Sequence, residues 1–165
     1  MPDDPPLSPG IAVDTLVEAG DWPDHVAIAS IAGTAIAAAA ARARPVIAPG
    51  AEVTVILTDD QHIRALNHRF RGKDAPTNVL SFAAGPPIAG RHGPLLGDIF
   101  LARETVAGEA ADRDIDLGHH ATHLIVHGFL HLVGYDHETE NEAVVMEGLE
   151  TFIMEDLGIA DPYAS

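Results

Sequence analysis

The 165-residue chain contains no cysteine. This absence excludes disulfide bonds, thiolate metal ligands and thiol nucleophiles together, so any bound metal must be held by nitrogen and oxygen atoms. Basic residues are also scarce, with nine Lys and Arg against 25 Asp and Glu and a formal net charge of −16. A chain this acidic has no general electrostatic attraction for nucleic acids, and phosphate chemistry would need a local basic site.

The sequence also lacks a secretory signal and a clear membrane span. Residues 1–6, M-P-D-D-P-P, have neither a basic region nor an apolar one. The uncharged run from Val26 to Ala41 has sixteen residues, most of them alanine, and is shorter than the ~20 that a membrane span needs. We interpret this run as a helix in the core of the protein, and we expect a cytoplasmic protein without membrane association.

The hydrophobic pattern predicts an α+β fold. Apolar and β-branched residues predict strands near residues 11–17, 52–57, 78–82 and 95–102, and apolar residues at helical spacing predict helices near 24–43, 60–71, 103–111, 117–133 and 140–157. A loop rich in Gly and Pro at residues 85–94 predicts that the last two strands are antiparallel. We expect a small mixed sheet of about four strands packed against several helices. A flexible tail at residues 1–10 would precede a single domain at residues 11–160.

Two helix starts carry the capping-box pattern, with Thr58 and Gln61 at the first and Thr139 and Glu142 at the second. In the helix after the first box, Phe70 falls at a position that we expect to face the interior. In the helix after the second box, we expect the same of Val145 and Phe152.

Six of the ten histidines lie between His119 and His137. His127 and His131 are four residues apart, so a helix places them on the same face. Gly134 can end that helix, and the chain can then turn and bring His137 back to the pair. Three histidine ligands with a fourth position open are typical of catalytic zinc. We therefore expect one Zn²⁺ per chain, held by a central helix and the turn that follows it.

Hydrolysis is the reaction class that such a site fits best. Zinc lowers the pKa of bound water from 15.7 to about 7, and it polarises carbonyl or phosphoryl oxygens. Metalloproteases carry H-E-x-x-H, in which the Glu is the general base, but here Gly128 stands at that position. Gly128 has two explanations, close helix packing or access for the substrate. A peptidase or esterase would need its base from elsewhere in the chain, and the sequence supplies no obvious one.

Two further residues near the histidines are candidate site residues. His123 lies one helical turn before His127, and it either supports the site from behind or contacts the substrate, or else it is a histidine of the helix surface. Asp136 precedes the third histidine, and it either orients an imidazole or belongs to a plain turn.

A basic cluster supplies the candidate phosphate-binding group. Arg64, Arg69, Arg71 and Lys73 fall within ten positions of an otherwise acidic chain. A guanidinium can bind a phosphate through two N–H groups and can stabilise charge that grows in a phosphoryl transition state. We favour Arg71 as the catalytic arginine, because it ends its helix just before the segment K-D-A-P-T-N. We interpret Arg64 and Arg69 as parts of a solvated helix face.

Residues 127–137, H-G-F-L-H-L-V-G-Y-D-H, closely resemble the signature of the YbeY family of bacterial ribosomal RNA maturation endoribonucleases. Residues 67–82 and 94–99 resemble two further blocks of that family, and the resemblance covers roughly residues 50–163. It implies a small sheet with surrounding helices and a zinc-dependent endoribonuclease specific for single-stranded RNA. The implied roles are maturation of the 3′ end of 16S rRNA and ribosome quality control. By motif position, His127, His131 and His137 would be the metal ligands and Arg71 the functional arginine.

The chain departs from the family pattern after Phe82, where Ala83 and Ala84 stand in place of the frequent Pro and aromatic residue. The acidic composition predicts weak binding of RNA by the isolated protein, so specificity would come from the small ribosomal subunit or a ribosomal protein as partner. Two alternatives stay open at this point. One is a different zinc metallohydrolase, such as a peptidase or esterase, and the other is a ribosome-assembly factor without catalysis.

Overall fold

The computed structural model describes residues 10–163, so the expected tail at residues 1–10 lies almost wholly outside the described residues. A mixed four-stranded sheet has the order β1-β2-β4-β3, in which β1, β2 and β4 are parallel and β3 is antiparallel to β4. The strands are β1 (Ala12–Val17), β2 (Glu52–Thr58), β3 (Val79–Ala83) and β4 (Leu95–Ala102). The helices are α1 (His25–Ala43), α2 (Asp60–Arg71), α3 (Arg103–Asp112), α4 (Leu117–Leu132) and α5 (Glu140–Asp156). The predicted α+β fold and the antiparallel pair are confirmed.

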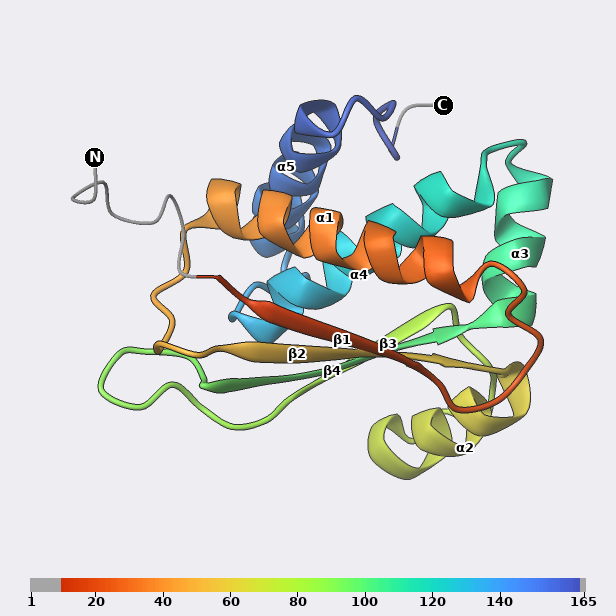
Figure 1. Ribbon diagram of the computed structural model, residues 1–165, viewed down its shortest axis with the longest axis horizontal. Coiled ribbons are helices and arrows are strands. Elements are labelled where there is room, and N and C mark those ends of the chain that lie inside the picture. Colours follow the sequence, from red (N-terminus) through yellow and green to blue (C-terminus); the bar gives the residue numbers. More distant parts are fainter. Residues whose placement is uncertain (1–9, 164–165) are drawn as a thin grey trace.

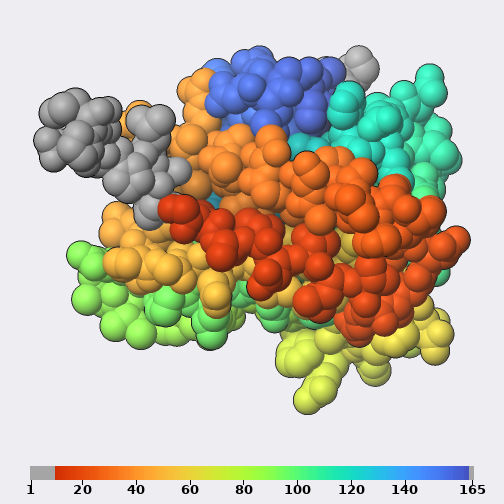
Figure 2. Space-filling view, viewed as in Figure 1, coloured from red at the N-terminus to blue at the C-terminus, as the bar shows by residue number. Residues whose placement is uncertain are grey.

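The helices are arranged in layers about the sheet (Figure 1). Helices α1 and α4 pack together on one face, and α2 lies on the opposite side near one end of the strands. Helix α5 contacts α1 and α4 from outside, so it forms a partial third layer. The near surface in Figure 2 shows this order directly, with β1, α1 and α5 in successive bands.

Helix α4 is the central helix of the fold. It contacts α1, α3, α5 and the strands β3 and β4, and most of its residues are buried. Its apolar side chains join one core with those of β2 and β4, which includes Leu124, Ile125, Val126, Phe129, Leu130, Val55, Leu57, Ile99 and Leu101. The Asp116 side chain caps the start of this helix and accepts a hydrogen bond from the backbone N–H of His119. The histidine-bearing helix is therefore packed against other elements along most of its surface.

The predicted cap of α2 was wrong by one residue. Asp59 is the N-cap and accepts a hydrogen bond from the backbone N–H of His62, whereas Thr58 is buried as the last residue of β2. Phe70 does not face the interior but is 51% exposed. Because α2 covers only one end of the sheet, Phe70 lies beyond the core and packs edge-on against Phe82, with ring centroids 5.3 Å apart.

Helix α5 begins with the predicted capping box of Thr139 and Glu142, but its inward face differs from the expected one. Val145 and Phe152 are exposed, and Phe152 lies beneath the guanidinium of Arg42. The buried residues are Met146, Glu150, Ile153 and Met154. The core packing of Met146, Ile153 and Met154 fixes the helix rotation, and this rotation carries a carboxylate, Glu150, into the interior.

Among the described helices, α1 alone is long and apolar enough to cross a membrane by length and composition, with a mean hydropathy of 1.6. Its buried residues lie against the rest of the core and include Ile28, Ala32, Ala35, Ile36 and Ala39. Small side chains on this face allow α1 to approach α4 closely. Packing within the fold thus accounts for the apolar residues on this face of the helix.

Candidate metal centre

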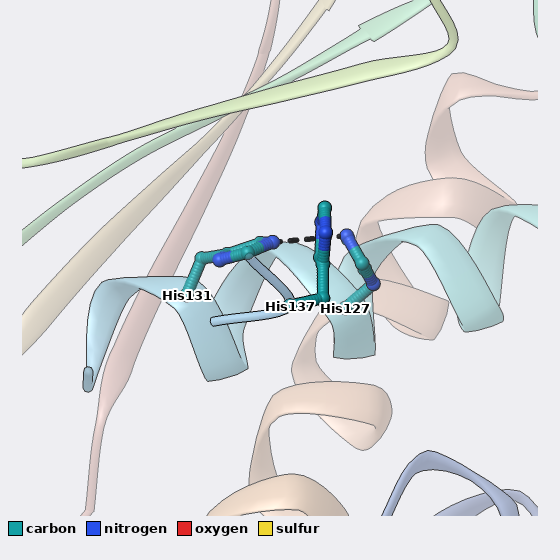
Figure 3. A group of neighbouring side chains, drawn as sticks. All are labelled: His127, His131 and His137. Atoms are coloured by element: carbon teal, nitrogen blue, oxygen red, sulfur yellow. Dashed lines mark hydrogen bonds between the residues drawn. The ribbon is translucent and has the colours of Figure 1, made fainter. Parts of the chain in front are cut away.

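The three predicted histidine ligands converge in space. His127 and His131 project from one face of α4, and their Nε2 atoms are 3.0 Å apart (Figure 3). The helix ends at Leu132, and Gly134 takes a positive φ of 102°, which an L side chain rarely adopts. The following turn brings His137 to the pair, and one nitrogen from each of the three rings lies within 4.8 Å of the others.

Hydrogen bonds at Nδ1 of His127 and His131 determine which ring nitrogen carries the hydrogen. His131 Nδ1 lies 2.9 Å from the backbone oxygen of Tyr135, and His127 Nδ1 lies 2.6 Å from a carboxylate oxygen of Glu150. Carbonyl and carboxylate oxygens only accept, so each Nδ1 must carry the hydrogen. In the neutral rings both Nε2 atoms then present lone pairs to each other. A cation between them removes this conflict, and the donor set therefore fits a metal ion.

The protonation state of His131 suits the same role. Burial is the main factor that lowers its pKa below the usual histidine value, and the neighbouring His127 and His137 lower it further. A histidine must be neutral to bind a metal. At neutral pH the site thus favours the neutral form of this ring, which is the form that binds a metal.

Glu150 is a site residue that the sequence prediction missed. Its side chain is fully buried and receives hydrogen bonds from His127 Nδ1 and the Tyr163 hydroxyl, and His123 Nε2 lies 3.5 Å from it. Burial alone would raise the pKa of its carboxyl, but the hydrogen bonds from His127 and Tyr163 and the nearby His123 ring outweigh burial and lower the pKa to about 2. Glu150 is therefore an ionised carboxylate at neutral pH. The sequence feature that could have identified it is the position of Glu150 between Met146 and Ile153 on the apolar face of the helix.

His123 and Asp136 occupy different positions about the histidines. His123 is buried, and its ring packs against that of Tyr163 with centroids 5.4 Å apart, so it is not a histidine of the helix surface. Asp136 lines the cavity described below, and its Oδ1 accepts a hydrogen bond from the backbone N–H of His137 at 2.8 Å. Its observed contact is thus one that stabilises the turn.

A cavity of about 750 Å³ lies beside the histidines. Arg71 and Lys73 line it from the end of α2 and the next loop, β3 lines another side, and His127, His131 and the turn of residues 134–138 complete it. Arg71 Nη2 donates to the backbone oxygen of Ser81 at 3.1 Å, and its guanidinium lies over the Phe82 ring. The structure thus brings Arg71 and the three histidines to one cavity.

The other two arginines of the basic cluster do not line this cavity. Arg64 forms two hydrogen bonds with the carboxylate of exposed Asp74. Arg69 lies over the ring of Phe70. Both positions agree with the interpretation of a solvated helix face.

Gly128 faces the sheet and not the cavity. A Cβ at this position would come within 2.9 Å of Cγ2 of the buried Ile99 on β4. Close packing of α4 on the sheet therefore explains this glycine. The position that carries the general base in metalloproteases has no room for a carboxylate here.

Residues 24–158 match the protein family described as Endoribonuclease YbeY. The chain belongs to this family. An Endoribonuclease YbeY of Chelativorans sp. is 50% identical over 161 residues, which cover 95% of this chain and 96% of that protein. One from Rhizobium meliloti is 52% identical over 153 residues, with 89% and 91% covered. Membership in the family makes the chain a hydrolase that cleaves RNA phosphodiester bonds.

The fold also resembles a solved structure, the solution structure of TM1509 from Thermotoga maritima. The TM-score is 0.52 at 21% sequence identity, and the likeness covers 94% of this chain and 99% of that one. At this identity the likeness supports the α+β fold alone.

Proposed function

We propose that this chain is a zinc-dependent endoribonuclease that is specific for single-stranded RNA and matures the 3′ end of 16S rRNA. We also propose that the protein takes part in ribosome quality control and acts in the cytoplasm. Its partner would be the small ribosomal subunit or a ribosomal protein. The proposal also treats residues 11–160 as a single domain. The observation that carries the proposal is the shared cavity of Arg71 and the three histidines, in a chain of an endoribonuclease family.

His127, His131 and His137 would hold one metal ion per chain. Three imidazoles without a thiolate suit zinc among other transition metals, and three protein ligands leave a position for substrate or water. When bound, zinc supplies Lewis acidity toward a phosphoryl oxygen and lowers the pKa of water.

Arg71 would bind the scissile phosphate. A guanidinium has five N–H groups, and the contact with the Ser81 oxygen uses only one nitrogen, Nη2. This contact and the packing on Phe82 hold the side chain at the cavity. Its remaining N–H groups can then donate to phosphate oxygens and stabilise the charge that develops during cleavage.

His123 and Asp136 would act by positioning other groups. His123 lies behind the histidine ligands, against Glu150 and Tyr163. Asp136 would hold the turn that carries His137, through the hydrogen bond to its backbone N–H.

The alternative of a peptidase or esterase loses support, since Gly128 is packed against Ile99 and the chain belongs to an endoribonuclease family. The alternative of an assembly factor without catalysis predicts that loss of the metal leaves ribosome maturation intact. Both alternatives are tested together with the proposed function.

The test combines purified enzyme with cells. We expect removal of zinc by a chelator to abolish cleavage of single-stranded RNA, and readdition of zinc to restore it, with duplex RNA resistant throughout. Arg71→Ala should lower the rate about 100-fold, while Arg64→Ala, which removes an arginine outside the cavity, should leave it near wild type. In cells, His127→Ala with His131→Ala should leave unprocessed 16S rRNA ends. Normal ends in cells whose variant binds no zinc would contradict the enzymatic proposal.

A further inference from the structure

Strand β3 is an edge of the sheet, and among the described strands it pairs only with β4. In an antiparallel pair, the N–H and C=O groups of alternate residues point toward the partner strand and those of the others point away. The Ala102 N–H donates to the Asn78 oxygen, and the Ala84 N–H donates to the Leu96 oxygen. The even-numbered residues of this segment therefore face β4, and residues 79, 81 and 83 direct their backbone groups outward.

Two hydrogen bonds on the outer edge agree with this assignment. The Val79 N–H donates to Asn78 Oδ1 at 2.7 Å, and the Ser81 oxygen accepts from Arg71 Nη2 at 3.1 Å. The Ser81 N–H has no acceptor within residues 10–163, although it points the same way as the Ser81 oxygen. An outward backbone donor is thus available next to the arginine of the site.

The outer edge of β3 opens into the cavity of the metal centre. Val79, Leu80, Ser81 and Ala83 line the cavity together with Arg71, His127 and His131. A phosphate that contacts both the histidine site and Arg71 would have its nucleosides next to this edge. The edge is therefore continuous with the proposed catalytic site.

We propose that the outer edge of β3, with the Ser81 N–H as its central donor, binds the Watson–Crick edges of unpaired nucleobases. This inference rests on the proposed function. Bases in single strands have free donors and acceptors on these edges, whereas a duplex uses them for pairing. Recognition through β3 would thus give the enzyme its preference for single-stranded RNA without any sequence-specific side chain.

The repeat of the strand favours an extended RNA. Outward groups on a β-strand recur every second residue, or about 6.8 Å. Phosphates along one strand of a stacked helix are only about 3.4 Å apart along the axis. Consecutive nucleotides of an unstacked strand can therefore reach successive outward groups of β3, whereas a stacked strand could reach them only with every second nucleotide.

An extended peptide is the other class of ligand that adds to a free strand edge. Two observations favour RNA as the occupant. The Arg71 guanidinium is held directly beside this edge through the Ser81 oxygen and can bind a phosphate, although Asp136 and Glu138 also line the cavity. The chain also belongs to a family of endoribonucleases. Peptide binding is therefore treated as an outcome of the test.

The first experiment compares Ser81→Pro with Ser81→Ala in the zinc-loaded enzyme. Proline removes the outward N–H but no hydrogen bond to β4, and edge strands tolerate it at such positions. Ser81→Ala keeps the N–H and removes only the hydroxyl. We expect kcat/KM for single-stranded RNA to be about 10-fold lower in Ser81→Pro than in Ser81→Ala, mainly through KM. Equal activity of the two variants, with native circular dichroism and zinc content, would overturn the proposal.

A change in the substrate tests the same contact without altering the fold. RNA with N3-methyluridine at the nucleotides that flank the cleavage site has a blocked Watson–Crick edge, whereas 5-methyluridine leaves that edge free. The wild-type enzyme should cleave the first RNA about 10-fold more slowly and the second at the normal rate. Ser81→Pro should discriminate less between them. Equal cleavage of both RNAs by the wild-type enzyme would contradict recognition through this edge.

The Ser81 amide resonance gives a readout that does not depend on cleavage. A short single-stranded RNA with a non-cleavable linkage should shift this resonance, and an extended peptide of equal length should not. A shift with the peptide alone would overturn the proposal. If the zinc-loaded wild-type enzyme cleaves no RNA, the proposed function fails, but an RNA-dependent shift of Ser81 would still support the binding edge.

Discussion

The Glu150 carboxylate lies 2.6 Å from Nδ1 of His127 and is fully buried. Glu150 belongs to α5 and His127 to α4, so this contact links α5 to the metal centre. An ionised carboxylate at this position holds the ring proton on Nδ1 and turns Nε2 toward the other two histidines. Carboxylates behind histidine ligands orient the ring and raise its basicity.

Replacement of Glu150 by Gln should therefore weaken metal binding. The amide keeps the shape of the side chain but lacks the negative charge that supports the ligand ring. We expect a 10- to 100-fold loss of zinc affinity, as is usual when such a partner is changed. Competition with a chelator of known affinity measures this loss. Glu155→Gln, at an exposed position of the same helix, is the matched control, and equal zinc affinity of the two variants would contradict the role of Glu150.

The Tyr163 hydroxyl donates to the second oxygen of Glu150 and so ties the last described residue to the site. Tyr163→Phe removes this donor and leaves a buried carboxylate with one hydrogen bond fewer. Because the Tyr163 side chain is partly exposed, we expect a loss of about 1 kcal/mol in the free energy of unfolding of the metal-free protein. Urea unfolding measures it, with Tyr135→Phe as the control. An unchanged unfolding midpoint would show that the hydroxyl does not stabilise Glu150.

Glu150 should also make the stability of the metal-free protein depend on pH. Its folded-state pKa of about 2 lies below the ordinary value of 4.5, so its contribution is complete above pH 4.5 and is lost as the pH falls toward 2. Glu150→Gln has no such group. The difference in unfolding free energy between wild type and this variant should therefore shrink across that range. A difference that stays constant or grows on acidification would contradict the lowered pKa.

The histidine ligands could be predicted from the sequence because their geometry is local. A spacing of four residues on a helix sets His127 against His131 whatever surrounds the helix, and Gly134 supplies the turn that returns His137. The strands were predictable for a similar reason, since β-branched and apolar residues concentrate in them.

The remaining features depend on contacts that are distant in the sequence. Glu150 follows His127 by 23 residues, and only the rotation of α5 on the core brings it inward. The same rotation exposes Val145 and Phe152, because Met146, Ile153 and Met154 occupy the interface instead. The outward edge of β3 follows from strand order, which no local pattern in the sequence contains.

Gly128 lay between these cases, because the sequence left packing and substrate access equally open. The structure favours packing, and this assignment can be tested by adding one methyl group. Gly128→Ala should gain about 1 kcal/mol in helix propensity, but its Cβ would meet Cγ2 of Ile99 at 2.9 Å. Overpacking of a core costs about 1–3 kcal/mol, so we expect a net loss in the free energy of unfolding.

The control for this substitution is Gly148→Ala on α5, where nothing lies within 4 Å of the added Cβ. Helix propensity alone should then act and stabilise the protein by up to about 1 kcal/mol. Ile99→Ala should cost less in the Gly128→Ala background than in wild type, because the smaller side chain makes room for the new methyl group. Urea unfolding of the two single variants and the double variant measures this coupling. Additive effects would mean that the two positions do not share the contact, and the packing explanation of Gly128 would then fail.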